Sequence, residues 1–316
     1  MSSNSASINY RTLVSQLIEV SKPSIIYLLD FVAISALLIA YLDTNYVTDP
    51  ANLSLTTIEG FTIVIGLIFA GTFSSAGSAA LNCYVDRDID IKMERTKNRA
   101  SATGQLPPNI TLIYGIIMIV LAAIISTIFL NLLTTGMILL GSFFYVFVYT
   151  IWLKRKTTWN IVIGGFAGSA AAFAGWTAIT GQLDLVAILM GSLVFIWTPS
   201  HFWALALLKD DDYTEAGIPM LPVVVGKVKA AQYTIINTLL LIPFSLVFVL
   251  PEFGFGYVYL TISVIFGILL LYSNVKLLQS PNDKKVALTA FKFSSPYLAI
   301  IFIALILDVL FRIPIF

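Results

Sequence analysis

Charged residues are scarce in this sequence: they make up 11% of its 316 residues, against roughly 25% in an average soluble protein. Cysteine and histidine each occur once, as Cys83 and His201. A single cysteine excludes an internal disulfide and any metal site built from several cysteines. The net charge of +1 argues against nucleic acid as a partner, because nucleic-acid-binding domains are usually strongly basic.

Apolar residues are in excess, at 58% of the chain with a mean hydropathy of +0.92. A helix of about 20 apolar residues is long enough to cross the hydrocarbon core of a bilayer. We therefore predict an all-α, polytopic membrane protein with nine transmembrane helices in one domain, residues 23–316. The predicted spans are Pro23–Leu42, Gly60–Leu81, Ile110–Leu130, Leu132–Leu153, Asn160–Ile179, Leu185–Leu208, Ala231–Leu250, Phe255–Leu278 and Pro296–Arg312.

The lysines and arginines predict the orientation. Of the 18, all but Arg312 precede the first span or follow an even-numbered span. Because cytoplasmic loops are enriched in Lys and Arg, we expect these loops and the polar N-terminal segment, residues 1–22, to be cytoplasmic. That segment lacks the cleavage site of a removed signal peptide. We expect an integral protein of the cell (plasma) membrane.

Two of the inner loops are long and rich in acidic residues. They follow the second and the sixth span, so four helices separate them. Internal repeats of this kind are common in membrane proteins. The order predicts a bundle of two parallel four-helix repeats plus a ninth helix.

The first acidic cluster lies in the stretch NCYVDRDID, residues 82–90. Asn82, Asp86 and Asp90 are spaced i, i+4 and i+8, so a helix would place them on one face. Neighbouring carboxylates repel each other unless a cation neutralises them, and oxygen ligands favour Mg²⁺ or Ca²⁺. Since Mg²⁺ usually takes its remaining ligands from water and phosphate, the pattern indicates a Mg²⁺ site for a polyphosphate substrate.

Basic residues lie within this cluster and directly after it. Their side chains suit phosphate oxygens. A cytoplasmic loop of a membrane protein would carry such residues in any case, so taken alone they leave both interpretations open. They are Arg87, Lys92, Arg95, Lys97 and Arg99.

The second acidic cluster, KDDDYTEAGIPMLP at residues 209–222, directly follows the sixth span. Its place in the proposed repeat matches that of the first cluster, and we expect the two to form halves of one site that binds more than one Mg²⁺. Metal ions on a diphosphate would neutralise a leaving group and allow a carbon–oxygen bond to ionise. The organic part of the substrate would be lipid-like, because the site opens into an apolar bundle.

These residues resemble the intramembrane prenyltransferases, whose first motif, Asn-x-x-x-Asp-x-x-x-Asp, is matched by Asn82, Asp86 and Asp90. The stretches DRDID, MERT, TPSHFWALAL and AGIPMLPVV are similar to the protohaem IX farnesyltransferase, or haem O synthase, branch of that family, and the resemblance extends over all nine predicted spans. Ala100 and Ser200 stand where prolines are expected. The Lys-Asp-Asp-Asp run is longer than expected, which leaves the register of Lys209 and Asp210 open.

The resemblance implies a reaction. Farnesyl diphosphate would ionise at the Mg²⁺ cluster, a vinyl group of protohaem IX would capture the allylic cation, and water would complete the substituent of haem O. Membrane lipid and haem-handling membrane enzymes would be further partners. The implied catalytic metal ligands are Asn82, Asp86, Asp90, Asp211 and Asp212, and the implied diphosphate-binding residues are Arg87, Lys92, Arg95 and Arg99.

Two polar residues lie inside predicted spans. His201 follows the helix-distorting Pro199 and lies about 10 Å from the cytoplasmic end of its span. Haem iron commonly takes a histidine ligand. From composition alone a hydrogen-bonded interior histidine is favoured, whereas the resemblance favours a haem contact. Asp30 is a functional candidate because it lies inside a predicted transmembrane helix. It belongs to no recognised motif, however, and we expect it to form a structural hydrogen bond or to be a protonated acid.

The sequence is compatible with other functions. A related prenyltransferase could act on a quinone precursor or on a glycerol-phosphate lipid, although HFWALAL and AGIPMLP favour the haem branch. A secondary transporter would also have many spans and internal repeats, but its substrate groups would lie near the bilayer centre rather than at one face.

Overall fold

The computed structural model describes residues 10–43, 57–311 and 313–315, and helices make up most of this part of the chain. Within it, nine segments are long and apolar enough to cross a membrane, which confirms the prediction of an all-α protein with nine spans. Arg312 lies outside the described residues. The spans are α2 (Pro23–Leu42), α3 (Thr57–Asp90), α5 (Pro108–Phe129), α6 with η2 (Leu132–Phe143 and Phe144–Leu153), α7 with α8 (Asn160–Gly164 and Phe166–Thr180), α9 (Leu185–Leu208), α12 with η3 (Lys227–Ser245 and Leu246–Val249), α13 (Tyr257–Gln279) and α14 (Lys284–Phe311).

Several helices extend beyond the predicted apolar runs, α3 and α14 by the most residues. Helix α3 continues past Leu81 to Asp90, and α14 begins at Lys284, well before Pro296. Hydropathy marks only the part of a helix that lies in hydrocarbon, whereas backbone hydrogen bonds continue the helix into the polar interface. Pro296 lies inside α14, because a membrane helix packed among neighbours tolerates an interior proline.

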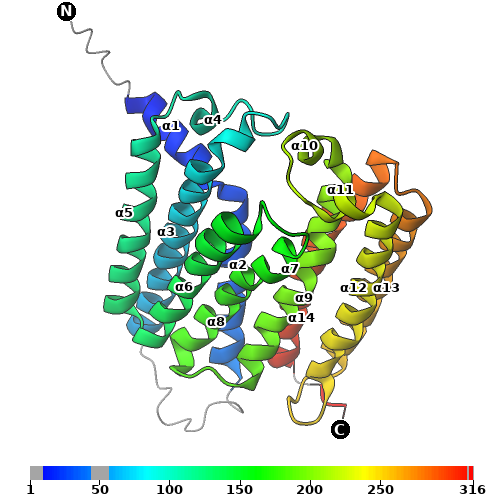
Figure 1. Ribbon diagram of the computed structural model, residues 1–316. Coiled ribbons are helices and arrows are strands. Elements are labelled where there is room, and N and C mark those ends of the chain that lie inside the picture. The colour runs from blue at the N-terminus through cyan, green and yellow to red at the C-terminus, as the bar shows by residue number, and fades with distance from the viewer. Residues whose placement is uncertain (1–9, 44–56, 312, 316) are drawn as a thin grey trace, which may run out of the picture.

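Consecutive spans pack against each other from α2 to α14, and α14 returns to contact α2, so that the bundle closes on itself (Figure 1). Helix α8 packs against α2, α6 and α9. A Cβ atom added at Gly175 would lie 1.9 Å from the carbonyl oxygen of Ala33, so the backbones of α8 and α2 approach too closely for a larger residue.

Four short helices lie at one end of the bundle: α1 (Tyr10–Ser21), α4 (Ala100–Thr103), α10 (Asp210–Glu215) and α11 (Leu221–Val225), at the top of Figure 1. Both acidic loops are at this end. Helix α1 packs against α3 through a buried cluster that includes Val20, Cys83 and Leu106. The N-terminal segment thus contributes a helix to the fold, and this helix positions Lys22 at the start of α2.

Candidate active site

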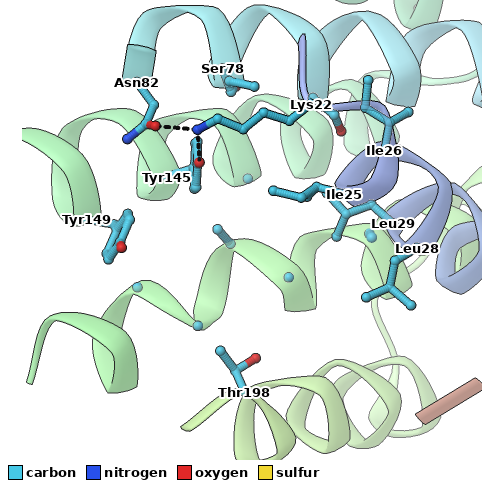
Figure 2. A pocket seen from close by; sticks show the side chains of 18 of the residues that line it. Lys22, Ile25, Ile26, Leu28, Leu29, Ser78, Asn82, Tyr145, Tyr149 and Thr198 are labelled. Atoms are coloured by element: carbon cyan, nitrogen blue, oxygen red, sulfur yellow. Dashed lines mark hydrogen bonds between the residues drawn. The ribbon is translucent and has the colours of Figure 1, made fainter. Parts of the chain in front are cut away.

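A cavity of about 520 Å³ lies inside the bundle. Spans from both halves line it, together with residues at the end that carries the acidic loops (Figure 2). Polar and charged side chains gather at that end, among them Lys22, Asn82 and Asp90. Deeper in the bundle the lining is mostly apolar, with residues such as Leu29 and Ala171. One cavity therefore offers a charged end and an apolar interior.

The first acidic motif lies on one helix, as its spacing predicts. Asn82, Asp86 and Asp90 all belong to α3 and are 4%, 0% and 3% exposed. The Asn82 amide donates to Asp86 Oδ2 over 2.7 Å and to Thr150 Oγ1 over 3.0 Å. These two bonds fix the orientation of the amide, so that its oxygen, Oδ1, faces Lys22 Nζ.

Each residue of the motif contacts a cation, and these cations come from different parts of the chain; Asp86 has a second, longer contact, 3.6 Å from its Oδ1 to Arg155 Nη2. Burial of a charged pair is costly unless the partners are well placed. Burial lowers the pKa of the Lys154 ammonium, and the Asp86 carboxylate opposes this shift. The pairs are Lys22 Nζ with Asn82 Oδ1 at 2.5 Å, Lys154 Nζ with Asp86 Oδ2, and Arg99 Nη1 with Asp90 Oδ2 at 3.0 Å.

The two carboxylate oxygens of Asp86 differ in their surroundings. Oδ2 accepts from both Asn82 and Lys154. Oδ1 is buried and has no hydrogen-bond partner among the described residues. A buried carboxylate oxygen without a hydrogen-bond partner needs an explanation, and a bound ion is one of the usual ones. The donor set, carboxylate and amide oxygens, fits a hard divalent cation such as Mg²⁺.

The predicted diphosphate-binding residues divide into two groups. Arg95 and Arg99 line the cavity. Arg87 and Lys92 are exposed, and neither is among the described residues that line the cavity. Arg87 instead donates to the carbonyl oxygen of Tyr84 over 2.6 Å and lies 4.8 Å from the centre of that ring.

The second acidic cluster meets the first through Asp212. This residue is 7% exposed, and its Oδ2 accepts from the backbone N–H of Arg95 at 3.4 Å. Asp211 is on the outside, with 72% of its side chain exposed and Oδ2 at 2.5 Å from Lys284 Nζ. This lysine lowers the pKa of Asp211. The two acidic loops are thus in contact, with Asp212 at the junction and Asp211 outside it.

Lys22 and Lys154 line the cavity beside the acidic motif, although the sequence indicated only their topological role. Lys22 has a left-handed backbone, with φ of 53° and ψ of 65°. It is the one such non-glycine residue in the described ranges, and strained backbone of this kind is concentrated at functional sites. The sequence gives only a weak indication that these lysines belong to the site: each is adjacent to the end of an apolar run.

Tyr145 and Tyr149 also line the cavity and were not predicted. Their rings stack with centroids 5.8 Å apart, and the Tyr145 hydroxyl lies 3.5 Å from Lys22 Nζ (Figure 2). Both belong to η2, a π-helix, and π-helical turns often occur at functional sites. Nothing in the local composition distinguishes this segment from an α-helix.

His201 lines the cavity from α9. Its ring stacks on Trp197 at 4.4 Å and on Phe291 at 4.7 Å. The Nδ1 atom is buried without a partner among the described residues. Asp30 also lines the cavity, and its Oδ2 accepts from Thr72 Oγ1 at 2.8 Å, which is the structural hydrogen bond expected for it.

Known proteins resemble this chain over most of its length. Protoheme IX farnesyltransferase 1 of Cenarchaeum symbiosum is 46% identical over 299 residues, which are 95% of this chain and 97% of that protein. The Protoheme IX farnesyltransferase of Sulfurisphaera tokodaii is 41% identical, with 92% of this chain and 91% of that protein covered. That of Picosynechococcus sp. is 37% identical, with 95% and 90% covered.

Solved structures share the fold. One from work on digeranylgeranylglyceryl phosphate synthase has a TM-score of 0.71 and 18% identity, covering 94% of this chain and 98% of that one. A UbiA homolog from Archaeoglobus fulgidus bound to DMAPP and Mg²⁺ has a TM-score of 0.61 and 15% identity, covering 92% and 99%. The model of the UbiA prenyltransferase family matches residues 21–296. The chain is an integral membrane protein and belongs to the UbiA prenyltransferase family.

Proposed function

We propose that this protein transfers the farnesyl group of farnesyl diphosphate to a vinyl group of protohaem IX, giving haem O and diphosphate. The observation that carries the proposal is the cavity, which has acidic and basic side chains at one end and an apolar interior. This arrangement suits a substrate with a charged head and a hydrocarbon chain. The names of the relatives, at 37% to 46% identity over most of the chain, support protohaem IX as the acceptor.

Asn82, Asp86 and Asp90 would hold Mg²⁺; the donor set supports this role, and so does Asp86 Oδ1, which has no hydrogen-bond partner among the described residues. Asp211 and Asp212 were predicted as the second set of metal ligands. The contact of Asp212 with the Arg95 backbone favours Asp212 for this role. Asp211 would first have to leave Lys284, and its role stays a prediction.

Basic residues around the cavity would bind the diphosphate. Lys22, Arg95, Arg99 and Lys154 all line it, whereas the roles predicted for Arg87 and Lys92 have no support from the cavity lining. Charge-assisted hydrogen bonds from such groups stabilise phosphate oxygens strongly in a site shielded from water. These bonds grow stronger as the leaving diphosphate gains charge, and this selective stabilisation promotes ionisation.

In the proposed reaction the bond between C1 of the farnesyl group and the diphosphate oxygen breaks, and the electron pair leaves with diphosphate. Bound Mg²⁺ supplies further neutralisation of the leaving group. The vinyl group then forms a carbon–carbon bond to C1, water adds to the resulting cation, and a proton is released. The aromatic rings of Tyr145 and Tyr149, which line the cavity near the charged end, would shield the allylic cation from water.

His201 would contact the haem. Since Trp197 and Phe291 stack on the imidazole ring, its edge, with the nitrogen atoms, is the part that can reach a ligand. Axial ligation predicts that purified protein shifts the absorption spectrum of added protohaem, and that His201→Ala abolishes the shift. An unchanged spectrum and affinity in this variant would exclude ligation by His201.

We further propose that the acidic loops face the cytoplasm and that the protein resides in the plasma membrane. The distribution of Lys and Arg supports this orientation. Residues 23–316 would act as one catalytic domain, to which the preceding segment adds Lys22. Protease protection of a tag placed before residue 10, in sealed vesicles, tests the orientation.

The function is tested by incubating membranes that contain the protein with Mg²⁺, farnesyl diphosphate and either protohaem IX or 4-hydroxybenzoate. Mass spectrometry should detect haem O in the first mixture and no prenylated product in the second. Prenylated 4-hydroxybenzoate would instead indicate a quinone-precursor prenyltransferase. Ion-coupled uptake of substrate without any prenylated product would indicate a transporter. Asp90→Ala membranes serve as the negative control.

A further inference from the structure

Asp88 is the middle one of the three carboxylates of DRDID and does not belong to the Asn-x-x-x-Asp-x-x-x-Asp spacing. It lies on α3 two residues after Asp86, and 60% of its side chain is exposed. Its carboxylate accepts two hydrogen bonds from Arg155, one from Nη1 to Oδ2 and one from Nη2 to Oδ1, both 2.7 Å long. This paired geometry fixes the guanidinium more firmly than a single contact would.

Arg155 is also close to the acidic motif. Its Nη2 donates to the carbonyl oxygen of Val85 over 2.9 Å and lies 3.6 Å from Asp86 Oδ1. That oxygen is the buried atom without a hydrogen-bond partner. The Arg155 guanidinium is therefore held just beyond hydrogen-bond distance from Asp86 Oδ1, the oxygen that would bind a metal ion.

We propose that Asp88 is a positioning residue: it holds Arg155 beyond hydrogen-bond distance from Asp86, so that Asp86 Oδ1 makes no direct hydrogen bond to the guanidinium and can bind a divalent cation. The inference rests on the metal site of the proposed function. Without Asp88, a shift of about 1 Å would bring the guanidinium to the usual 2.7–2.9 Å of an ion pair with Asp86. Arg155 would then compete with the metal ion for this oxygen.

The test measures metal binding directly. Purified protein in detergent is titrated with Mn²⁺, the free ion is followed by electron paramagnetic resonance, and added Mg²⁺ displaces the bound ion. In Asp88→Asn, an ion pair between Arg155 and Asp86 would compete with the metal ion. If this pair is as strong as an ordinary surface ion pair, Mn²⁺ binding should weaken about fivefold. Glu94→Gln is the matched control: Glu94 is an exposed acid in the turn that follows α3 and pairs with Lys97 at 2.6 Å. It removes the same charge and should leave binding within twofold of wild type.

A double variant separates positioning from a merely structural role. If Asp88 acts through Arg155, then Asp88→Asn should have no effect in an Arg155→Gln background, because the competing cation is gone. An equal loss of Mn²⁺ affinity in both backgrounds, or no loss in Asp88→Asn, would overturn the inference. Binding that follows the expected pattern in a protein that forms no haem O would overturn the proposed function and leave this inference standing.

Discussion

The buried pair of Asp86 and Lys154 allows the structural role of Asp86 to be separated from its catalytic role. The Asp86 side chain is 1% exposed and that of Lys154 is 11% exposed. Asp86→Ala would leave the Lys154 ammonium buried without its partner, which typically costs about 3–5 kcal/mol of folding free energy. Turnover should also fall below about a tenth of normal, because a contact to the metal site is lost.

Replacing both partners should give a different result. In Asp86→Ala/Lys154→Met, no charge is left unpaired, and apolar replacements of buried ion pairs are often neutral for stability. We expect the double variant to recover most of the free energy of unfolding lost in Asp86→Ala, and to remain inactive. Stability and activity would thus separate within one pair of variants.

Unfolding in mixed micelles by sodium dodecyl sulfate, followed by tryptophan fluorescence, measures the free energy. Haem O formation, followed by mass spectrometry, measures turnover. Wild-type stability in Asp86→Ala would refute the inferred cost of the unpaired Lys154. Recovery of turnover in the double variant would refute the catalytic role of Asp86.

Three further predictions follow from other contacts. Asp308 in α14 is 2% exposed and accepts hydrogen bonds from two backbone N–H groups at the start of α13, at 2.6 Å and 2.9 Å. Asp308→Ala should therefore lower the free energy of unfolding by roughly 2–4 kcal/mol, and Asp308→Asn by about half as much. Equal losses in the two variants would contradict this. Gly175→Val places a Cβ atom 1.9 Å from a backbone oxygen of α2 and should lower the free energy of unfolding by about 1–3 kcal/mol or more in the same assay. Gly136→Ala is the control: a Cβ atom there has nothing within 4 Å, and the free energy of unfolding should not change. Lys22→Gly relieves a left-handed backbone that costs about 1–2 kcal/mol, so stability should hold. The KM for farnesyl diphosphate should nonetheless rise about tenfold or more, as expected for the loss of a charged hydrogen-bond donor, and an unchanged KM would exclude Lys22 from the site.

The spans and the motif face could be predicted because both depend on local patterns. Hydrocarbon selects apolar runs of a fixed length, so hydropathy alone located nine helices. The helical period of 3.6 residues places Asn82, Asp86 and Asp90 on one face wherever the helix lies. The predicted span ended at Leu81, and only the motif spacing indicated a helix as far as Asp90, because polar residues continue a helix without contributing to the apolar signal.

The sequence could not show which of the basic residues line the cavity. Arg87 and Arg95 are equally basic neighbours of the motif, yet of the two only Arg95 lines the cavity, because Arg87 lies on an exposed face of α3 whereas Arg95 lies in the turn that follows this helix. Lys154 contacts Asp86 across 68 residues of chain. Such contacts depend on how the helices pack, and no local pattern encodes them.

The central claim is that the two acidic loops bind one diphosphate together. An experimental structure with Mn²⁺ and a non-hydrolysable farnesyl diphosphate analogue tests it most directly, since the anomalous signal of Mn²⁺ locates the metal. We predict Mn²⁺ beside Asp86 and Asp90, a diphosphate between these residues and Asp212, and the prenyl chain inside the cavity. A diphosphate bound at one loop alone, or outside the cavity, would contradict the claim.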